Sequence, residues 1–125
     1  RAGELGGLAL VVGGRSLGAR VACRTADATG AAAVLCLAFP LQPPQRRGAA
    51  GPAPRRLDEL DAVTVPTLVV QGTGDPFGIP PEGPSRRVVG VAGNHALKSD
   101  LDAVGEAIGD WLRTTVLREA RAQAR

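Results

Sequence analysis

Three side chains in this 125-residue sequence are of the types that transfer an acyl group through a serine: Ser16, Asp75 and His95. A serine hydroxyl is a weak nucleophile unless an adjacent base takes its proton, and a neutral imidazole needs a carboxylate to fix its tautomer. His95 is the single histidine of the chain, so it is the one imidazole that can act as this base. The order serine, acid, histidine therefore predicts a Ser-Asp-His hydrolase, provided that the fold brings the three side chains together.

Ser16 lies in the sequence Gly14-Arg15-Ser16-Leu17-Gly18, which has the G-x-S-x-G spacing of a nucleophile elbow. Such an elbow is a sharp strand-to-helix turn that lifts the serine hydroxyl clear of the sheet edge. We expect a side chain at Gly14 or Gly18 to collide with the neighbouring strand and helix. The Leu17 amide stands at the predicted helix N-terminus, where its N–H can donate to an oxyanion that develops on a substrate.

The same turn has a rival interpretation as a nucleotide-binding loop. Gly13 and Gly18 have the G-x-x-x-x-G spacing of a phosphate loop, but Ala19 and Arg20 stand where a Walker loop needs Lys and Ser or Thr. The dinucleotide fingerprint G-x-G-x-x-G fails because Arg15 occupies the position of its second glycine. The sequence therefore gives little support to nucleotide binding.

Each of the three side chains also has a purely structural interpretation. Ser16 could be an inert residue of a tight turn, Asp75 an Asx-turn residue bonded to its own backbone, and His95 a structural or solvated histidine. The joint pattern favours catalysis, because each residue follows a different predicted strand.

Four short apolar runs, punctuated by Gly or Pro, predict strands that are buried on both faces, as in a parallel sheet. These runs are Leu8–Gly13, Ala32–Phe39, Pro66–Gly72 and Arg87–Ala92. Helical spacing follows the first run over 17–28 and returns over 100–117, and 57–63 could form one or two short helical turns. The order predicts an α/β fold, with a parallel sheet of about four strands and flanking helices.

The two long helices have recognisable ends. Gly30 is a natural stop for the first helix, and Ser99 is the expected N-cap of the last helix, with Asp102 three positions later as in a capping box. The apolar side of the first helix is formed by Leu17, Val21, Ala22 and Ala26. Residues 40–56, rich in Pro and Arg, are expected to form an exposed loop.

In a parallel sheet the carboxyl ends of the strands meet at one edge, and ligands gather there. Ser16 follows the first predicted strand, Asp75 the third and His95 the fourth. We therefore expect the three side chains to converge at this edge.

Composition limits the remaining functions. The chain is 44% hydrophobic and 22% charged with a net charge of +3, which fits one domain or part of one. Lys98 is the one lysine among 15 basic residues, and the arginines are not interleaved with aromatic residues, so we expect no nucleic-acid partner. No apolar run reaches the ~18 residues of a membrane span and no signal segment opens the chain, so we expect a cytoplasmic location and no membrane partner.

The two cysteines, Cys23 and Cys36, fall in a predicted helix and a predicted strand. We expect them to be a reduced, buried pair. The sequence holds no Cys/His cluster, so no metal site is expected.

On these residues the sequence resembles the α/β-hydrolase superfamily. More narrowly, it resembles a dienelactone-hydrolase-like group that includes testis-expressed protein 30 and a subunit of the NSL chromatin complex. The shared stretches, within about residues 5–113, are Gly13-Gly-Arg-Ser-Leu-Gly18, Phe39-Pro-Leu-Gln-Pro-Pro44, Val70-Gln-Gly-Thr-Gly-Asp-Pro-Phe-Gly78 and Gly93-Asn-His-Ala-Leu-Lys98. The resemblance implies Ser16 as nucleophile, Asp75 as acid and His95 as base, with no cofactor.

A chain that begins at Arg1 and contains no Met is expected to be a fragment. It resembles the C-terminal portion of one α/β-hydrolase domain over residues 1–117, followed by a polar tail at 118–125. The resemblance implies that the family's N-terminal strands are missing, together with a Gly-rich loop that supplies a second oxyanion donor. We therefore expect weak catalysis in this truncated form, and a sheet edge that is open to self-association.

The predicted function is hydrolysis of a small ester or thioester substrate through an acyl-Ser16 intermediate. The alternative is a non-catalytic α/β-hydrolase-like protein-interaction module, since some members of the group are subunits of larger assemblies and a fold does not fix a function. The intact order of Ser16, Asp75 and His95 favours hydrolysis. Gln42 and Gly74, which stand where the family usually has His and a larger polar residue, favour a binding role.

Overall fold

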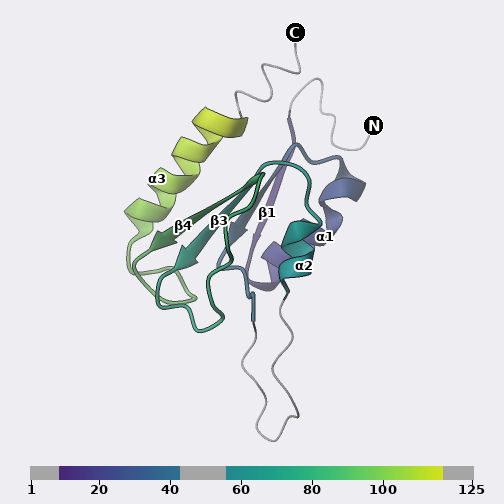
Figure 1. Cartoon of the computed structure of the whole chain (residues 1–125). Helices are drawn as coiled ribbons and strands as arrows, with labels where there is room; N and C mark the ends of the chain where they lie inside the picture. Colours follow the sequence, from purple (N-terminus) through teal and green to yellow (C-terminus); the bar gives the residue numbers. More distant parts are fainter. Residues whose placement is uncertain (1–8, 43–55, 117–125) are drawn as a thin grey trace, which may run out of the picture.

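The computed structural model describes residues 9–42 and 56–116, in which four parallel strands form one sheet (Figure 1). The strands stand in chain order, β1-β2-β3-β4, and each pairs in parallel with the next. Their bounds are β1 Val11–Arg15, β2 Ala33–Leu37, β3 Thr67–Gly72 and β4 Arg86–Val91. The prediction of a parallel sheet with flanking helices is confirmed.

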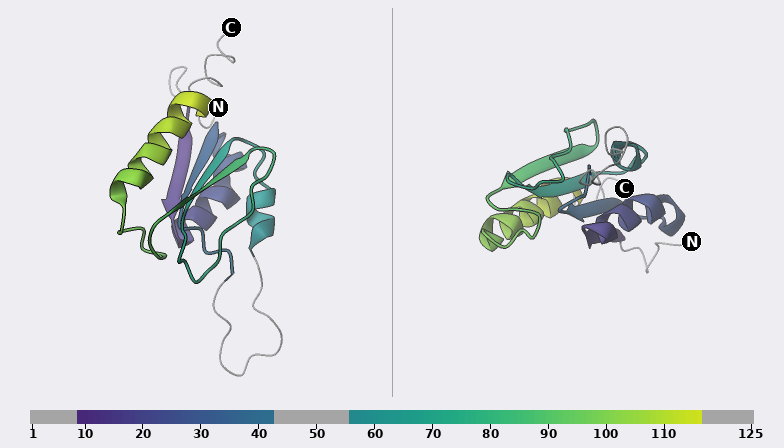
Figure 2. Two further views of the ribbon diagram at one scale, coloured as in Figure 1. Left: turned by 60° about the vertical axis from the view of Figure 1, so that its left-hand side comes forward. Right: turned by 90° about the horizontal axis from the view of Figure 1, so that it is seen from below.

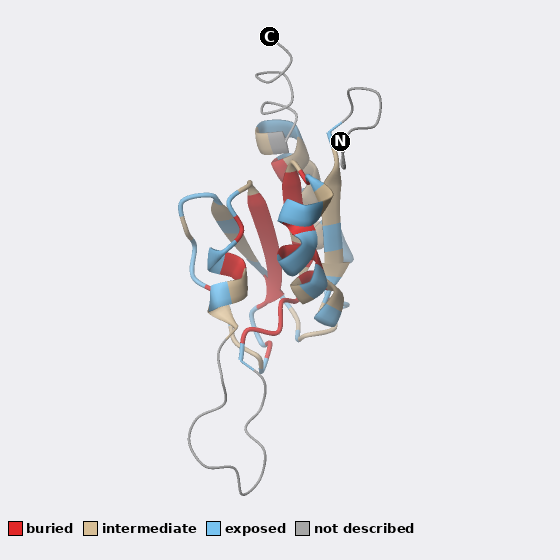
Figure 3. Ribbon diagram, turned by 90° about the vertical axis from the view of Figure 1, so that its right-hand side faces the viewer, coloured by how far each residue is buried: buried red, intermediate tan, exposed pale blue. Residues whose placement is uncertain are grey.

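Parallel strands need connections that cross a face of the sheet; helices lie in the β1–β2 and β2–β3 connections, whereas residues 73–85 join β3 to β4 without a helix. The helices are α1 (Leu17–Thr29) between β1 and β2, α2 (Leu57–Asp61) before β3, and α3 (Leu101–Trp111) after β4. α1 and α2 cover one face of the sheet and α3 covers the other (Figures 1 and 2). The inner strands β2 and β3 thus have a strand on each side and helices above and below, and β3 is buried at every residue (Figure 3).

The first strand differs from its prediction. The apolar run predicts Leu8–Gly13, whereas β1 extends from Val11 to Arg15. Pairing with β2 begins at Val11 opposite Ala33 and continues to Arg15 opposite Leu37, so the glycine expected to end the strand lies inside it. The backbone hydrogen-bond ladder, and not the apolar run, sets the limits of the strand.

α1 turns small residues toward the sheet. Leu17 is 64% exposed and Val21 is 49% exposed, although the sequence assigns both to the apolar side of this helix. The residues of α1 that are buried are Ala19, Ala22, Cys23 and Ala26. The prediction is therefore right for the two alanines and wrong for the two larger residues, because small side chains let the helix lie close to β1 and β2.

The end of α1 agrees with its prediction. Gly30 adopts a left-handed conformation with φ 68°, and its N–H caps the carbonyl groups of Ala26 and Asp27. Glycine takes this conformation without the steric cost that a Cβ brings, which is why it ends helices so often.

The two cysteines meet in the core between α1 and β2. The sulfur atoms of Cys23 and Cys36 are 3.5 Å apart, and both residues are free and buried, as predicted. Hydrogen bonding to Cys23 and burial together raise the pKa of the Cys36 thiol far above its usual range. This thiol therefore stays protonated and acts as part of the apolar core.

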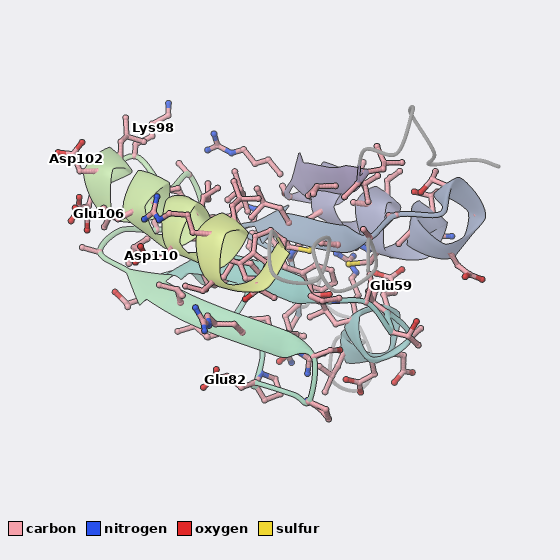
Figure 4. The ribbon with its side chains drawn as sticks, turned by 90° about the horizontal axis from the view of Figure 1, so that it is seen from above. Glu59, Glu82, Lys98, Asp102, Glu106 and Asp110 are labelled. Carbon is pink, nitrogen blue, oxygen red and sulfur yellow. The ribbon has the colours of Figure 1, made fainter. Side chains whose placement is uncertain are left out.

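α3 begins one residue later than expected. Its N-cap is Asp100, whose carboxylate accepts a hydrogen bond from the Ala103 N–H at 3.0 Å, so the prediction of Ser99 with Asp102 as a capping box is wrong. The helix ends at Trp111, and the π-helical turns of η1 (Leu112–Val116) continue it. Asp102, Glu106 and Asp110 lie along the outer side of α3, away from the sheet (Figure 4).

Two predicted segments fall beyond the part of the chain that the structure describes. Of the expected loop at 40–56, residues 43–55 lie outside the described residues, and so does the expected polar tail at 118–125. The predicted short helical turns at 57–63 correspond to α2, which ends at Asp61.

Candidate active site

Ser16 occupies the turn between β1 and α1. Its backbone has φ 53° and ψ −117°, a conformation that residues with a side chain rarely adopt. The Ser16 N–H donates to the Leu37 carbonyl at 2.9 Å, which ties the turn to the end of β2. A strained turn between a strand and a helix is the feature that defines a nucleophile elbow.

The two glycines of the motif differ in what they permit. A Cβ on Gly14 would lie 2.2 Å from the backbone of Gly18, so no side chain fits at that position. A Cβ on Gly18 would meet no atom of the described residues within 4 Å. The expected collision is therefore correct for Gly14 and wrong for Gly18, because Gly18 faces open space from the first turn of α1.

Asp75 follows β3 in a turn that buries its side chain completely. The Asp75 N–H donates to the Gly72 carbonyl at 3.0 Å, and the Asp75 Oδ1 accepts the Phe77 N–H at 2.8 Å. This second bond is the Asx-turn interaction that the structural interpretation proposes. It engages one carboxylate oxygen and leaves Oδ2 for other partners.

His95 follows β4 on a loop that crosses the end of β3. A Cβ on Gly72 would lie 2.3 Å from the carbonyl oxygen of Asn94, so the loop reaches the sheet edge only because residue 72 is glycine. The imidazole of His95 also lies against the Phe77 ring, with centroids 4.4 Å apart and planes tilted by 47°. The first contact positions the loop that carries His95, and the second packs the imidazole against an aromatic ring.

The three side chains form one hydrogen-bonded chain. The Ser16 Oγ is 2.8 Å from the His95 Nε2, and the His95 Nδ1 is 2.7 Å from the Asp75 Oδ2. An ionised carboxylate can only accept, so the Nδ1 carries the hydrogen and the Nε2 lone pair faces the serine hydroxyl. The histidine side chain is 24% exposed, while the aspartate side chain is fully buried. In this arrangement Ser16 can pass its proton to an imidazole that is hydrogen-bonded to a buried carboxylate.

The Leu17 N–H is the first backbone donor of α1. The first N–H groups of a helix have no acceptor within the helix, and they carry the positive end of its dipole. A negative charge developing next to Ser16 Oγ would be stabilised by this donor.

Besides Phe77, two further residues contact the site and were not among the candidates. The Arg15 guanidinium donates to the Ala96 carbonyl, which links the end of β1 to residues 92–100 between β4 and α3, the histidine loop. The Gln71 side chain donates to the Asp75 Oδ2 at 3.2 Å. The signal for Gln71 is present in the sequence, because it is a polar residue at the end of the otherwise apolar run 66–72.

Across residues 9–42 and 56–116, no group of three or more His, Cys, Asp or Glu side chains is arranged to hold a metal ion. In the same part of the chain, no helix has both the length and the apolar character needed to cross a membrane.

The chain is similar to known proteins in family and in fold. A family model described as "Alpha/beta hydrolase domain" matches residues 4–98, a range that contains all three side chains. Among solved structures, the "Thioesterase Domain From Curacin Biosynthetic Pathway" is similar with a TM-score of 0.53 and 15% sequence identity. That match covers 83% of this chain and 65% of the thioesterase domain, and at this identity it shows a shared fold alone. No curated protein matches the chain.

Proposed function

Since this chain belongs to the alpha/beta hydrolase domain family, and its sheet and helices form part of that fold, we propose that it is a serine hydrolase. The proposed reaction transfers the acyl group of an ester or thioester to water. The observation that carries the proposal is the hydrogen-bonded chain from Ser16 through His95 to Asp75, with distances of 2.8 and 2.7 Å.

In the first half of the proposed reaction, Ser16 Oγ attacks the acyl carbonyl carbon while His95 Nε2 takes the hydroxyl proton. The carbonyl oxygen becomes an oxyanion, to which the Leu17 N–H donates. Asp75 keeps the Nδ1 proton of His95 in place and stabilises the imidazolium that forms.

The imidazolium then gives its proton to the departing alcohol or thiol, and the acyl-Ser16 intermediate remains. In the second half, His95 takes a proton from water, the resulting hydroxide attacks the acyl carbon, and the carboxylic acid leaves as Ser16 regains its proton. No step needs a cofactor.

The narrower assignments belong to this proposal as well. The shared motifs quoted above support membership of the dienelactone-hydrolase-like group, and the fold shared with a thioesterase domain makes thioesters reasonable test substrates. We also propose a small acyl compound as the substrate and the cytoplasm as the location.

Fluorophosphonate labelling tests the proposed nucleophile, because this probe reacts covalently with activated serines. We expect the wild-type chain to be labelled, Ser16→Ala to lose all labelling, and Ser99→Ala, which removes an exposed serine, to be labelled like the wild type. Labelling of Ser16→Ala at the wild-type rate would show that the nucleophile is not Ser16.

One observation favours the alternative of a non-catalytic interaction module. Leu17 and Val21 are exposed on α1 beside Ser16, and apolar side chains in such a position suit a protein contact. The same labelling experiment decides between the two functions, since a folded wild-type chain that takes up no probe supports the interaction module.

A further inference from the structure

Gln71 is a fully buried polar residue at the sheet edge that carries the site. It is the last residue but one of β3, and none of its surface is exposed. A primary amide in such surroundings is unfavourable unless its oxygen and its two N–H groups find partners. The hydrogen bonds of this amide therefore indicate the role of Gln71.

Backbone groups from two segments hold the amide in place. Gln71 Oε1 accepts the Phe39 N–H at 3.0 Å, and Nε2 donates to the carbonyl oxygens of Phe39 and Gly78, both at 2.8 Å. These groups belong to the chain just after β2 and just after the Asp75 turn. The position of the amide is thus set by the fold and not by the Asp75 side chain.

The same Nε2 also donates to Asp75 Oδ2 at 3.2 Å. The amide has two hydrogens for three acceptors, so the longest of these bonds is shared. Asp75 Oδ2 is the oxygen that accepts the His95 Nδ1–H, and Oδ1 accepts the Phe77 N–H. Rotation of the carboxylate would break bonds at both of its oxygens.

We propose that Gln71 is a positioning residue: its fold-anchored amide orients the Asp75 carboxylate and thereby fixes the tautomer of His95. With the hydrogen on Nδ1, the Nε2 lone pair is left facing Ser16 Oγ. Within the described residues the Gln71 amide is hydrogen-bonded to Phe39, Gly78 and Asp75 and not to Ser16 or His95, so it acts through Asp75. The importance of Gln71 for catalysis rests on the proposed function. Its effect on the His95 tautomer does not, and it can be measured without any substrate.

A purely structural role for Gln71 is the rival explanation, since the amide also ties the end of β2 to the end of β3. Nitrogen NMR of the imidazole separates the two roles, because His95 is the one histidine of the chain and its signals need no assignment. In the wild-type chain with a neutral imidazole, we expect the Nδ1–H tautomer alone.

The test variant is Gln71→Met, which keeps the length of the side chain and removes the amide. We expect the single tautomer to be lost, with both ring nitrogens showing mixed protonation. The matched control is Thr67→Val, because Thr67 is buried at the opposite end of the same strand and donates to the Val65 carbonyl at 3.0 Å. The control should keep the wild-type tautomer. A folded Gln71→Met chain that keeps the Nδ1–H tautomer overturns the proposal.

If Gln71→Met does not fold, Gln71→Glu takes its place, because this variant retains an oxygen for the Phe39 N–H. The introduced carboxyl can donate to Asp75 only while it is protonated, and buried carboxyl groups titrate as high as about pH 8–9. We expect the Nδ1–H tautomer to be lost as this group ionises. A tautomer identical to that of the wild type up to about pH 10 overturns the proposal.

Kinetics then connect the positioning role to catalysis. If the chain hydrolyses an ester, Gln71→Met should lower kcat in the wild-type background and have no further effect in the Asp75→Asn background, since Gln71 acts through that carboxylate. Equal losses in both backgrounds overturn the proposal. Failure of the proposed function appears separately, as absence of fluorophosphonate labelling in a chain whose tautomer still responds to Gln71.

Discussion

At the scale of single residues, the site depends on positions where the chain tolerates strain or needs empty space. Ser16 is held at φ 53°, a conformation that costs about 1–3 kcal/mol, and its N–H bond to Leu37 together with the start of α1 maintains it. Gly14 and Gly72 have no room for a Cβ, because backbone of another segment lies within 2.2 and 2.3 Å of where it would stand. The conformation of the Ser16 turn and the position of His95 thus both require backbone segments to pass close to a glycine.

The Gly72→Ala variant tests this dependence. The added Cβ would push on the Asn94 carbonyl, displace the neighbouring His95 and separate it from Ser16, so we expect fluorophosphonate labelling to fall to the background level. Unfolding monitored by circular dichroism should show a loss of stability as well.

Gly105→Ala is the matched control for this variant. A Cβ at Gly105, in the middle of α3, meets no described atom within 4 Å. We expect normal labelling and a gain in stability of up to ~1 kcal/mol, since alanine is a better helix former than glycine. Normal labelling of Gly72→Ala would mean that the histidine loop does not need the close approach.

At the scale of elements, an ion pair joins the two helices that share one face of the sheet. Arg20 on α1 donates to both carboxylate oxygens of Glu59 on α2, at 2.7 and 3.1 Å, and Arg24 lies 3.7 Å from the same carboxylate. Glu59 lies on the side of the molecule opposite to the acidic side chains of α3 (Figure 4). Because α1 begins directly after Ser16, this pair helps to keep the helix over the strands that carry the site.

The pH dependence of stability should reveal this ion pair. The hydrogen bond from Arg20 holds the pKa of Glu59 below its ordinary value of 4.5. A lowered pKa in the folded state adds stability above the unfolded pKa, and this stability is lost as the pH falls through the folded pKa. We expect Glu59→Gln to cost up to ~1 kcal/mol at pH 7, and this difference from the wild type to vanish in acid.

Urea unfolding of both chains across this pH range measures the difference. Glu82→Gln is the control, since Glu82 is an exposed glutamate on the loop between β3 and β4, and its replacement should leave stability nearly unchanged (Figure 4). A Glu59→Gln difference that stays constant down to about pH 3 would show that the charge of Glu59 does not matter.

At the scale of the whole molecule, stability comes from two apolar clusters on opposite faces of one sheet. Cys36, Phe39 and Val69 belong to the cluster under α1 and α2, and Leu68 and Trp111 belong to the cluster under α3. Neither cluster alone covers β2 and β3, so the folded chain needs helices on both faces.

Trp111→Ala tests the contribution of the α3 face. The indole is 1% exposed, and removal of a buried tryptophan side chain costs about 3–5 kcal/mol, a large part of the 5–15 kcal/mol that stabilises a typical domain. Leu101→Ala on the same helix is the control, because Leu101 is 67% exposed and its loss should cost less than ~0.5 kcal/mol. Thermal unfolding followed by circular dichroism compares the two, and similar small losses would show that α3 contributes little to the core.

The amino-acid pattern was enough to predict the order of the elements and the end of the sheet at which Ser16, Asp75 and His95 lie. Apolar runs that end in Gly or Pro are a local signal of buried parallel strands, and a residue just after a strand lies at its carboxyl end in any parallel sheet. Gly30 was equally predictable, because a helix stop depends on the conformation of one residue.

The contacts between these elements could not be predicted from the sequence. The periodicity of α1 favours burial of Leu17 and Val21, yet the helix packs against the sheet through its alanines and leaves both larger side chains exposed. Asp100 and not Ser99 caps α3, because the N-cap is the residue at which the histidine loop ends and the helix begins. The role of Gln71 could not be predicted, because it depends on the segments after β2 and β3 that surround its amide in the folded chain. Hydrogen bonds between residues distant in sequence depend on how packed elements meet in space, and the spacing of residues along a chain does not contain that information.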